Sequence, residues 1–210
     1  MSSTASTLPQ ARRASLVVRL LKPGNTLPAT VWVFLVISQA VSSPFPPSLS
    51  TALLVFINTV AVALFMVRRD ATRVGGKLDT AVALSGTFVV SFLQGPKVQD
   101  TELVPSLIQM VGLFGWAYSL ITLGRSFGIV AADRGLVQHG PYRFIRHPVY
   151  AFEAMFFLGY FAAIPTTRSA VVLLVAFALQ IMRIVREERI ISGYEEYRQR
   201  VRWRLLPGVW

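Results

Sequence analysis

Cysteine is absent from this 210-residue chain, and histidine occurs only twice. The absence of thiols excludes disulfides, thiolate catalysis and zinc-thiolate sites, and two histidines are too few for a His-rich metal cage. Charged residues make up only 15% of the chain, whereas soluble domains carry about 25%. Apolar residues account for 53%, and the mean hydropathy is +0.54. This composition predicts an integral membrane protein.

Six apolar runs are spaced along the chain, and each is a candidate membrane segment. A helix needs about 20 residues, with a range near 17–25, to cross the hydrocarbon core. The runs at 49–67 and 103–123 meet that length, whereas those at 27–41 and 78–93 need flanking residues to reach it. The last two, 149–164 and 169–182, form a hairpin around "PTTR" and either span fully or dip partway. The predicted fold class is therefore all-α, a polytopic transmembrane helical bundle of five to six membrane segments with a C-terminal hairpin.

Acidic residues are also scarce, with 10 Asp and Glu against 21 Lys and Arg and a net charge of +11. The basic residues are unevenly placed: the 42–48 loop has none, and the 94–102 and 165–168 loops have one each. Cytoplasmic loops collect Lys and Arg, so this asymmetry predicts that both termini and the 124–148 segment face the cytoplasm. It also explains the positive charge without a nucleic-acid partner. The polar lead lacks the apolar core and cleavage site of a secretory signal.

The stretch "GPYRFIRHPVY" (140–150) gathers two arginines, a histidine and two tyrosines in an otherwise apolar chain. Pro148 suits the first turn of a helix, so His147 is expected at the mouth of that helix. Tyr150 and Glu153 are three residues apart and therefore share a face. Glu153 lies inside the apolar run "VYAFEAMFFLGYFAAI", where a carboxylate is costly and indicates a functional role. The alternative is that Glu153 lies near the interface, either hydrated or paired with an arginine.

A second polar cluster marks the end of the last run, in "QIMRIVREERIISGYEEYRQRV". If the last two helices are antiparallel, this cluster meets the one at the start of the fifth helix. The clusters are Arg146, His147 and Tyr150 on one helix and Arg183, Glu187 and Glu188 on the other. Together they would form a polar pocket at the membrane boundary that suits a zwitterionic ligand. An apolar groove between the helices would admit a lipid from the bilayer.

Several motifs between residues 110 and 210 carry a resemblance to a known family. They are "LGRSFG" (123–128), "LVQHGPYRFIRHPVY" (136–150), "REE" (186–188), "GYEEY" (193–197) and "LLPG" (205–208). In order and spacing they resemble the isoprenylcysteine carboxyl methyltransferase and phospholipid methyltransferase superfamily of integral membrane enzymes. The resemblance implies a methyltransferase that uses S-adenosylmethionine and acts on a lipophilic, prenyl- or lipid-like substrate arriving from the bilayer. It leaves the oligomeric state open.

The same resemblance implies which residues form the site, at the cytoplasmic face. It places in the cofactor pocket Gly140, Pro141, Tyr142, Arg146, His147, Tyr150, Glu187 and Glu188. The catalytic candidates are Glu153, Arg183 and His147, and no metal is expected. The predicted organisation is a cytoplasmic basic lead over 1–26, four transmembrane helices over 27–123, and a catalytic region over 124–210 that holds the cofactor-binding loop, the helical hairpin and a cytoplasmic C-terminal segment.

One residue and one span depart from the family pattern. Phe152 stands where a glycine often follows the motif tyrosine by two, and its bulk is expected to reshape either the tunnel or the helix contact. The span 103–123 has no charged residue, whereas carboxyl-methylating relatives tend to carry a basic one there. The lack of a charged residue in this span disfavours a prenylcysteine carboxylate as substrate. Glu153 is then a candidate to face the substrate, as a base for a hydroxyl, an amine or another nucleophile.

Two other classes of function stay open. A membrane reductase that uses NADPH on a sterol or enone lipid has a similar C-terminal architecture, and it would bind nicotinamide instead of a sulfonium. A non-enzymatic scaffold or transporter subunit would favour polar residues in the middle of several spans. Here the ionisable groups gather at one end of the last two helices instead.

Overall fold

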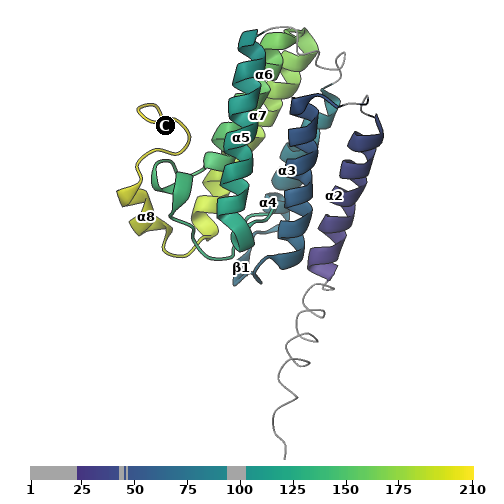
Figure 1. Cartoon of the computed structure of the whole chain (residues 1–210). Coiled ribbons are helices and arrows are strands. Elements are labelled where there is room, and N and C mark those ends of the chain that lie inside the picture. Colours follow the sequence, from purple (N-terminus) through teal and green to yellow (C-terminus); the bar gives the residue numbers. More distant parts are fainter. Residues whose placement is uncertain (1–22, 43–44, 46, 94–102) are drawn as a thin grey trace, which may run out of the picture.

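Helices make up most of the described chain, which in the computed structural model comprises residues 23–42, 45, 47–93 and 103–210 (Figure 1). The first half holds α2 (Pro23–Ser42), α3 (Leu49–Val67), α4 (Lys77–Phe88) and the 3₁₀ turn η1 (Val89–Phe92). The second half holds α5 (Leu103–Leu123), η2 (Gly124–Ser126), η3 (Gly140–Arg143), α6 (Pro148–Ala163), α7 (Thr167–Ile190) and α8 (Tyr194–Arg200). Two-residue strands, β1 (Arg73–Val74) and β2 (Ala132–Asp133), are the only strands in these ranges. The predicted all-α class is confirmed.

Four helices in the described ranges are long and apolar enough to cross a membrane, namely Gly24–Ser42, Leu49–Val67, Leu103–Ser126 and Thr167–Ile190. They support the prediction of a polytopic membrane protein. α6 is also apolar but shorter, with 16 residues. The segment expected at 78–93 differs: α4 has 12 residues and then tightens into η1. Its last turns carry Ser85, Gly86 and Thr87, which have low helix propensity and shorten the regular helix.

α6 and α7 form the predicted helical hairpin. α6 ends at Ala163, and α7 begins at Thr167, where the Thr166 hydroxyl accepts a hydrogen bond from the Ser169 N–H at 3.1 Å. In Figure 1 the two helices run side by side, and α5 packs against α6. The start of α6 and the end of α7 therefore lie at the same end of the bundle. We call this the polar end, and it comprises residues 68–76, 124–147 and 190–210.

α5 and α6 pack closely because glycines lie at their contact. A Cβ at Gly112 would lie 2.5 Å from the backbone nitrogen of Phe156, and one at Gly159 would lie 2.8 Å from the Cγ of Gln109. Gly115 likewise makes room for the ring of Phe152. Of the two effects expected of Phe152, the structure therefore shows the helix contact, since its side chain lines neither of the cavities described below.

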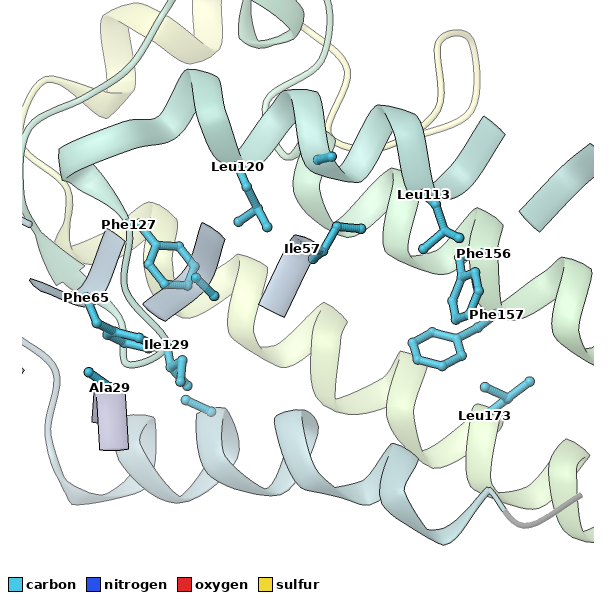
Figure 2. Packing of buried hydrophobic residues seen from close by; sticks show 13 residues of the cluster. Ala29, Ile57, Phe65, Leu113, Leu120, Phe127, Ile129, Phe156, Phe157 and Leu173 are labelled. Carbon is cyan, nitrogen blue, oxygen red and sulfur yellow. The ribbon is translucent and has the colours of Figure 1, made fainter. Parts of the chain in front are cut away.

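The apolar core continues from this interface toward α3. Figure 2 shows Leu113 of α5 beside Phe156 of α6 within the core cluster. Further along, Phe65 of α3 meets Phe127 edge-on, with ring centroids 5.0 Å apart. Phe127 and Ile129 come directly after η2 and are buried in the same cluster. The loop that follows α5 is therefore anchored in the core.

The two short strands tie this loop to the rest of the polar end. β1 and β2 pair antiparallel, with Arg73 opposite Asp133. The Asp133 carboxylate accepts hydrogen bonds from the backbone N–H of Ser192 at 3.0 Å and of Gly135 at 3.2 Å. Hydrogen bonding by Ser192 is the main reason that the pKa of Asp133 is lowered from its ordinary value. The carboxylate thus holds the loop against the chain that leaves α7.

Candidate functional site

The start of α6 is built against the C-terminal segment. Pro148 is the first residue of the helix, and His147 precedes it as predicted. The backbone N–H groups of Arg146 and His147 donate to the carbonyls of Trp203 at 2.8 Å and Arg204 at 2.9 Å. These bonds satisfy donors ahead of the first helical turn, where no intrahelical partner exists. They hold the His147 ring at the mouth of the helix.

A cavity of about 570 Å³ lies beside this helix mouth. Its volume is in the range of small-molecule sites, about 300–1,000 Å³. Its wall includes most of the predicted site residues, namely Tyr142, Arg146, His147, Tyr150, Glu153, Arg183 and Glu187. The predicted Gly140, Pro141 and Glu188 do not line it. Gly140 and Pro141 instead form the η3 turn that places Tyr142 in the wall. The hairpin therefore brings the two predicted clusters together.

Glu187 lines the cavity together with two groups that can donate to it. The Tyr150 hydroxyl donates a hydrogen bond to Glu187 Oε1, and Arg183 Nη2 lies 3.9 Å from the same oxygen. The Arg183 guanidinium also lies over the Tyr150 ring, 5.0 Å from its centroid. One wall of the cavity thus combines a phenol, a guanidinium and a carboxylate.

Glu188 is engaged differently, because protein donors surround its carboxylate. Its two oxygens each accept a hydrogen bond from Arg204 at 3.0 Å, and Tyr194 donates to Oε1 at 3.1 Å. His147 Nε2 lies 3.2 Å and Arg146 Nη1 3.3 Å from that same oxygen. The hydrogen bond to Glu188 raises the pKa of Arg204. Glu188 therefore ties α7 to the start of α6 and to the C-terminal segment, and its implied contact with a cofactor stays a prediction.

Glu153 lies further along α6, where the large cavity meets a second one of about 210 Å³. Its Oε2 accepts a hydrogen bond from the Gln180 amide at 2.6 Å, and Gln180 in turn accepts one from Arg183 at 3.3 Å. The partner of Glu153 is thus an amide on α7, and not an arginine. The walls of the second cavity are otherwise mostly apolar, with Leu158 and Ile181 among them.

Some residues of this region were missed by sequence reasoning. Tyr194 and Tyr197 stand in the "GYEEY" motif, which offered a signal, but no role was assigned to them. The Tyr197 hydroxyl donates to the backbone carbonyl of Tyr142, and Tyr194 contacts Glu188 as described. Burial raises the pKa of both tyrosines, so they act as neutral donors. No sequence motif includes Gln180, Arg134 or Arg204, so only the tertiary structure identifies them.

The cavity contains cationic donors that lack a hydrogen-bond partner. Arg183 Nε, Arg146 Nε and Arg134 Nε are buried and unsatisfied within the described residues. Because Glu187 lies in the same wall, the site offers both signs of charge to a ligand. This donor set fits a zwitterion such as the amino-acid part of S-adenosylmethionine. The described residues contain no group of three or more His, Cys, Asp or Glu that could hold a metal ion.

Comparison with known proteins shows a family match and a similar curated protein. Residues 100–198 match the model of a family described as phospholipid methyltransferase. The chain is also similar to the cobalt-zinc-cadmium resistance protein CzcN of Cupriavidus metallidurans, with 32% identity over 123 residues. That alignment covers 55% of this chain and 56% of the relative, so the chain spans little more than half of the curated protein it matches.

Proposed function

We propose that this protein moves a methyl group from S-adenosylmethionine to a lipophilic substrate. Residues 100–198 belong to the phospholipid methyltransferase family, and hence to the superfamily that it forms with the isoprenylcysteine carboxyl methyltransferases. The observation that carries the proposal is the meeting of the start of α6 and the end of α7 around one cavity. There the Tyr150–Glu187 hydrogen bond joins the two helices beside Arg183.

The residues of the large cavity would hold the cofactor. When bound, S-adenosylmethionine supplies a methyl group that its sulfonium charge has already activated. Glu187 would accept hydrogen bonds from the amino group of the cofactor, and Tyr150 and Arg183 fix the position of that carboxylate. Tyr142, Arg146 and His147 line the same space. Gly140 and Pro141 would act through the turn that places Tyr142, and Glu188 by holding His147.

The second cavity would take the apolar part of the substrate. It lies between α4, α6 and α7, and the side chains of Leu158 and Ile181 in its wall are also exposed on the outer surface. In a membrane this surface faces lipid, so an acyl or prenyl chain could pass between the helices without crossing water. The reactive end of such a substrate would reach Glu153, which borders both cavities.

Glu153 would take the proton of the substrate if the nucleophile is an N–H or O–H group. The nucleophile's electron pair would form the new bond to the methyl carbon while the sulfur–methyl bond breaks and its electron pair stays on the sulfur of S-adenosylhomocysteine, the leaving group. The proton of the nucleophile would pass to the carboxylate of Glu153. The Gln180 amide holds Glu153 in place, and Arg183 holds Gln180. His147, fixed by Glu188 and Tyr194, is the second group that could move a proton. General acid–base catalysis of this kind contributes about 10²–10⁴-fold to a rate.

The polar end would face the cytoplasm. It carries Arg residues in the loop after α5, before α6 and throughout the C-terminal segment. Loops rich in Lys and Arg stay on the cytoplasmic side during insertion. Both termini, the cofactor cavity and the start of α6 would then lie on that side, where S-adenosylmethionine is available.

The proposal is tested with the full chain purified in detergent. Calorimetry should detect binding of S-adenosylmethionine, and a radiolabelled methyl group should move from it into a membrane lipid extract. Glu187→Gln should weaken cofactor binding, whereas Glu196→Gln, which removes an exposed carboxylate of α8, should not. A protein that binds NADPH and no S-adenosylmethionine would support the reductase instead. Failure to bind either cofactor would contradict both enzyme proposals.

A further inference from the structure

Arg134 lies directly after β2 and lines the large cavity. Its Nε is buried without a hydrogen-bond partner in the described part of the chain. Among the described residues, three arginines line the cavity wall, and two of them form ion pairs with a glutamate. Arg146 faces Glu188, and Arg183 faces Glu187. Within the described ranges, no hydrogen bond or ion pair engages the guanidinium of Arg134.

The neighbours of Arg134 make room for its guanidinium, but no carboxylate in the described part of the chain forms a hydrogen bond or an ion pair with it. A Cβ at Gly128 would lie 2.6 Å from Arg134 Nη1, so the glycine allows the guanidinium to lie against the backbone. Asp133 directly precedes Arg134, but its carboxylate accepts hydrogen bonds from the backbone N–H groups of Ser192 and Gly135 instead. Burial is the main reason that the pKa of Arg134 is lowered to about 10; the positive charge of Arg68 contributes to this lowering, and the negative charge of Asp70 opposes it. Arg134 is therefore still charged at neutral pH.

A cation in this position is costly unless an anion reaches it, because partial burial removes water from the guanidinium. The loop that carries it cannot simply swing away, since Phe127 and Ile129 anchor the loop in the core and β2 pairs with β1. The planar guanidinium offers paired donors that match the oxygens of a carboxylate or a phosphate.

We propose that Arg134 is the anion-binding residue of the large cavity and that it binds an oxyanion group of one of the two molecules held there. The group is either the carboxylate of the cofactor or a phosphate on the lipid substrate. The identity of the ligand rests on the proposed methyl transfer, whereas the anion site itself rests only on Arg134 and its surroundings.

The experiment compares wild type with Arg134→Gln, Arg134→Lys and the control Arg200→Gln, all as full chains in detergent. Arg200 is exposed at the end of α8, so its replacement removes one charge without touching the cavity. Calorimetry measures the affinity of S-adenosylmethionine and of its decarboxylated analogue. Thermal shifts in mixed micelles compare dioleoyl phosphatidic acid with dioleoylglycerol, which differ only in the phosphate.

If Arg134 binds the cofactor carboxylate, Arg134→Gln weakens S-adenosylmethionine binding about 10- to 100-fold and leaves binding of the decarboxylated analogue unchanged. If it binds a lipid phosphate, cofactor affinity stays the same and the preference for phosphatidic acid over dioleoylglycerol is lost. Arg134→Lys, which keeps the charge, should fall between wild type and Arg134→Gln, and it carries the test if the glutamine variant does not fold.

The inference is overturned if Arg134→Gln binds both the cofactor and phosphatidic acid as wild type does, or if Arg200→Gln shows the same losses. If the wild-type protein binds no S-adenosylmethionine, this result contradicts the proposed function but not the anion site. The anion site would then be judged by the phosphate comparison: a preference that disappears in Arg134→Gln supports it, and no preference in wild type contradicts it.

Discussion

Replacement of Glu188 by glutamine should destabilise the protein even when no ligand is bound. The variant removes the negative charge that Arg146 and Arg204 share, and it leaves an amide beside the guanidinium of Arg204. Loss of one partner of a buried charge pair costs about 3–5 kcal/mol. The side chain of Glu188 is only 9% exposed, but that of Arg204 is 24% exposed. Water therefore compensates part of the loss, and we expect about 2–4 kcal/mol.

This loss can be measured by thermal unfolding in detergent without cofactor. For a chain of this size each kcal/mol shifts the melting temperature by about 2–4 °C, so Glu188→Gln should melt about 5–15 °C lower than wild type. Glu196→Gln is the matched control, because Glu196 is exposed. Its melting temperature should stay close to that of wild type.

A double-mutant cycle tests whether the loss comes from the Glu188–Arg204 contact. Because Arg204 donates to both oxygens of Glu188, Arg204→Met combined with Glu188→Gln should cost less than the sum of the two single changes, by about 1–2 kcal/mol. The reasoning is refuted if Glu188→Gln melts like Glu196→Gln, or if the two changes are additive. Glu188 would then be available to a ligand, as the family resemblance implies.

Three further predictions follow from the packing and the site. Glu153→Gln should lower methyl transfer by about 100-fold or more while leaving S-adenosylmethionine affinity unchanged, and equal turnover would exclude Glu153 as the proton acceptor. Gly112→Ala should cost about 1–3 kcal/mol in thermal unfolding, because its new methyl group meets the backbone of Phe156; unchanged stability would contradict the close contact. The pKa of Asp133 is lowered in the folded protein, so its stabilisation is present above the ordinary aspartate pKa and is lost as the pH falls through the lowered value. The gap in melting temperature between wild type and Asp133→Asn should therefore be larger at pH 7 than at pH 3, and a gap independent of pH would refute this linkage.

The membrane helices could be read from the sequence because their signal is local. Apolar runs such as 49–67 and 103–123 correspond closely to α3 and α5, since a lipid-facing helix needs apolar side chains along its length. The helix expected at 78–93 is shorter in the structure, where α4 ends at Phe88. The hydroxyl residues and the glycine in this segment do not interrupt the apolar run on a hydropathy scale, but they weaken the helix.

The difference between Glu187 and Glu188 could not be read from the sequence. Adjacent residues on a helix point about 100° apart, so the two carboxylates face different surroundings. Which one lines the cavity depends on how α7 is rotated against α6, and that rotation is set by packing along the whole helix. In the structure Glu187 lines the cavity, whereas Glu188 accepts hydrogen bonds from Arg204 and its neighbours.

By itself, the sequence determined that this is a helical membrane protein whose ionisable residues gather where its C-terminal hairpin begins and ends, at the start of α6 and the end of α7. Those features follow from hydropathy, charge placement and short motifs, which are properties of neighbouring residues. Only the tertiary structure decided that Glu153 bonds to Gln180, that Phe152 packs against α5, and that Arg134 Nε lies buried with no hydrogen-bond partner among the described residues. These contacts join segments far apart in the chain, and they exist only once the helices are packed.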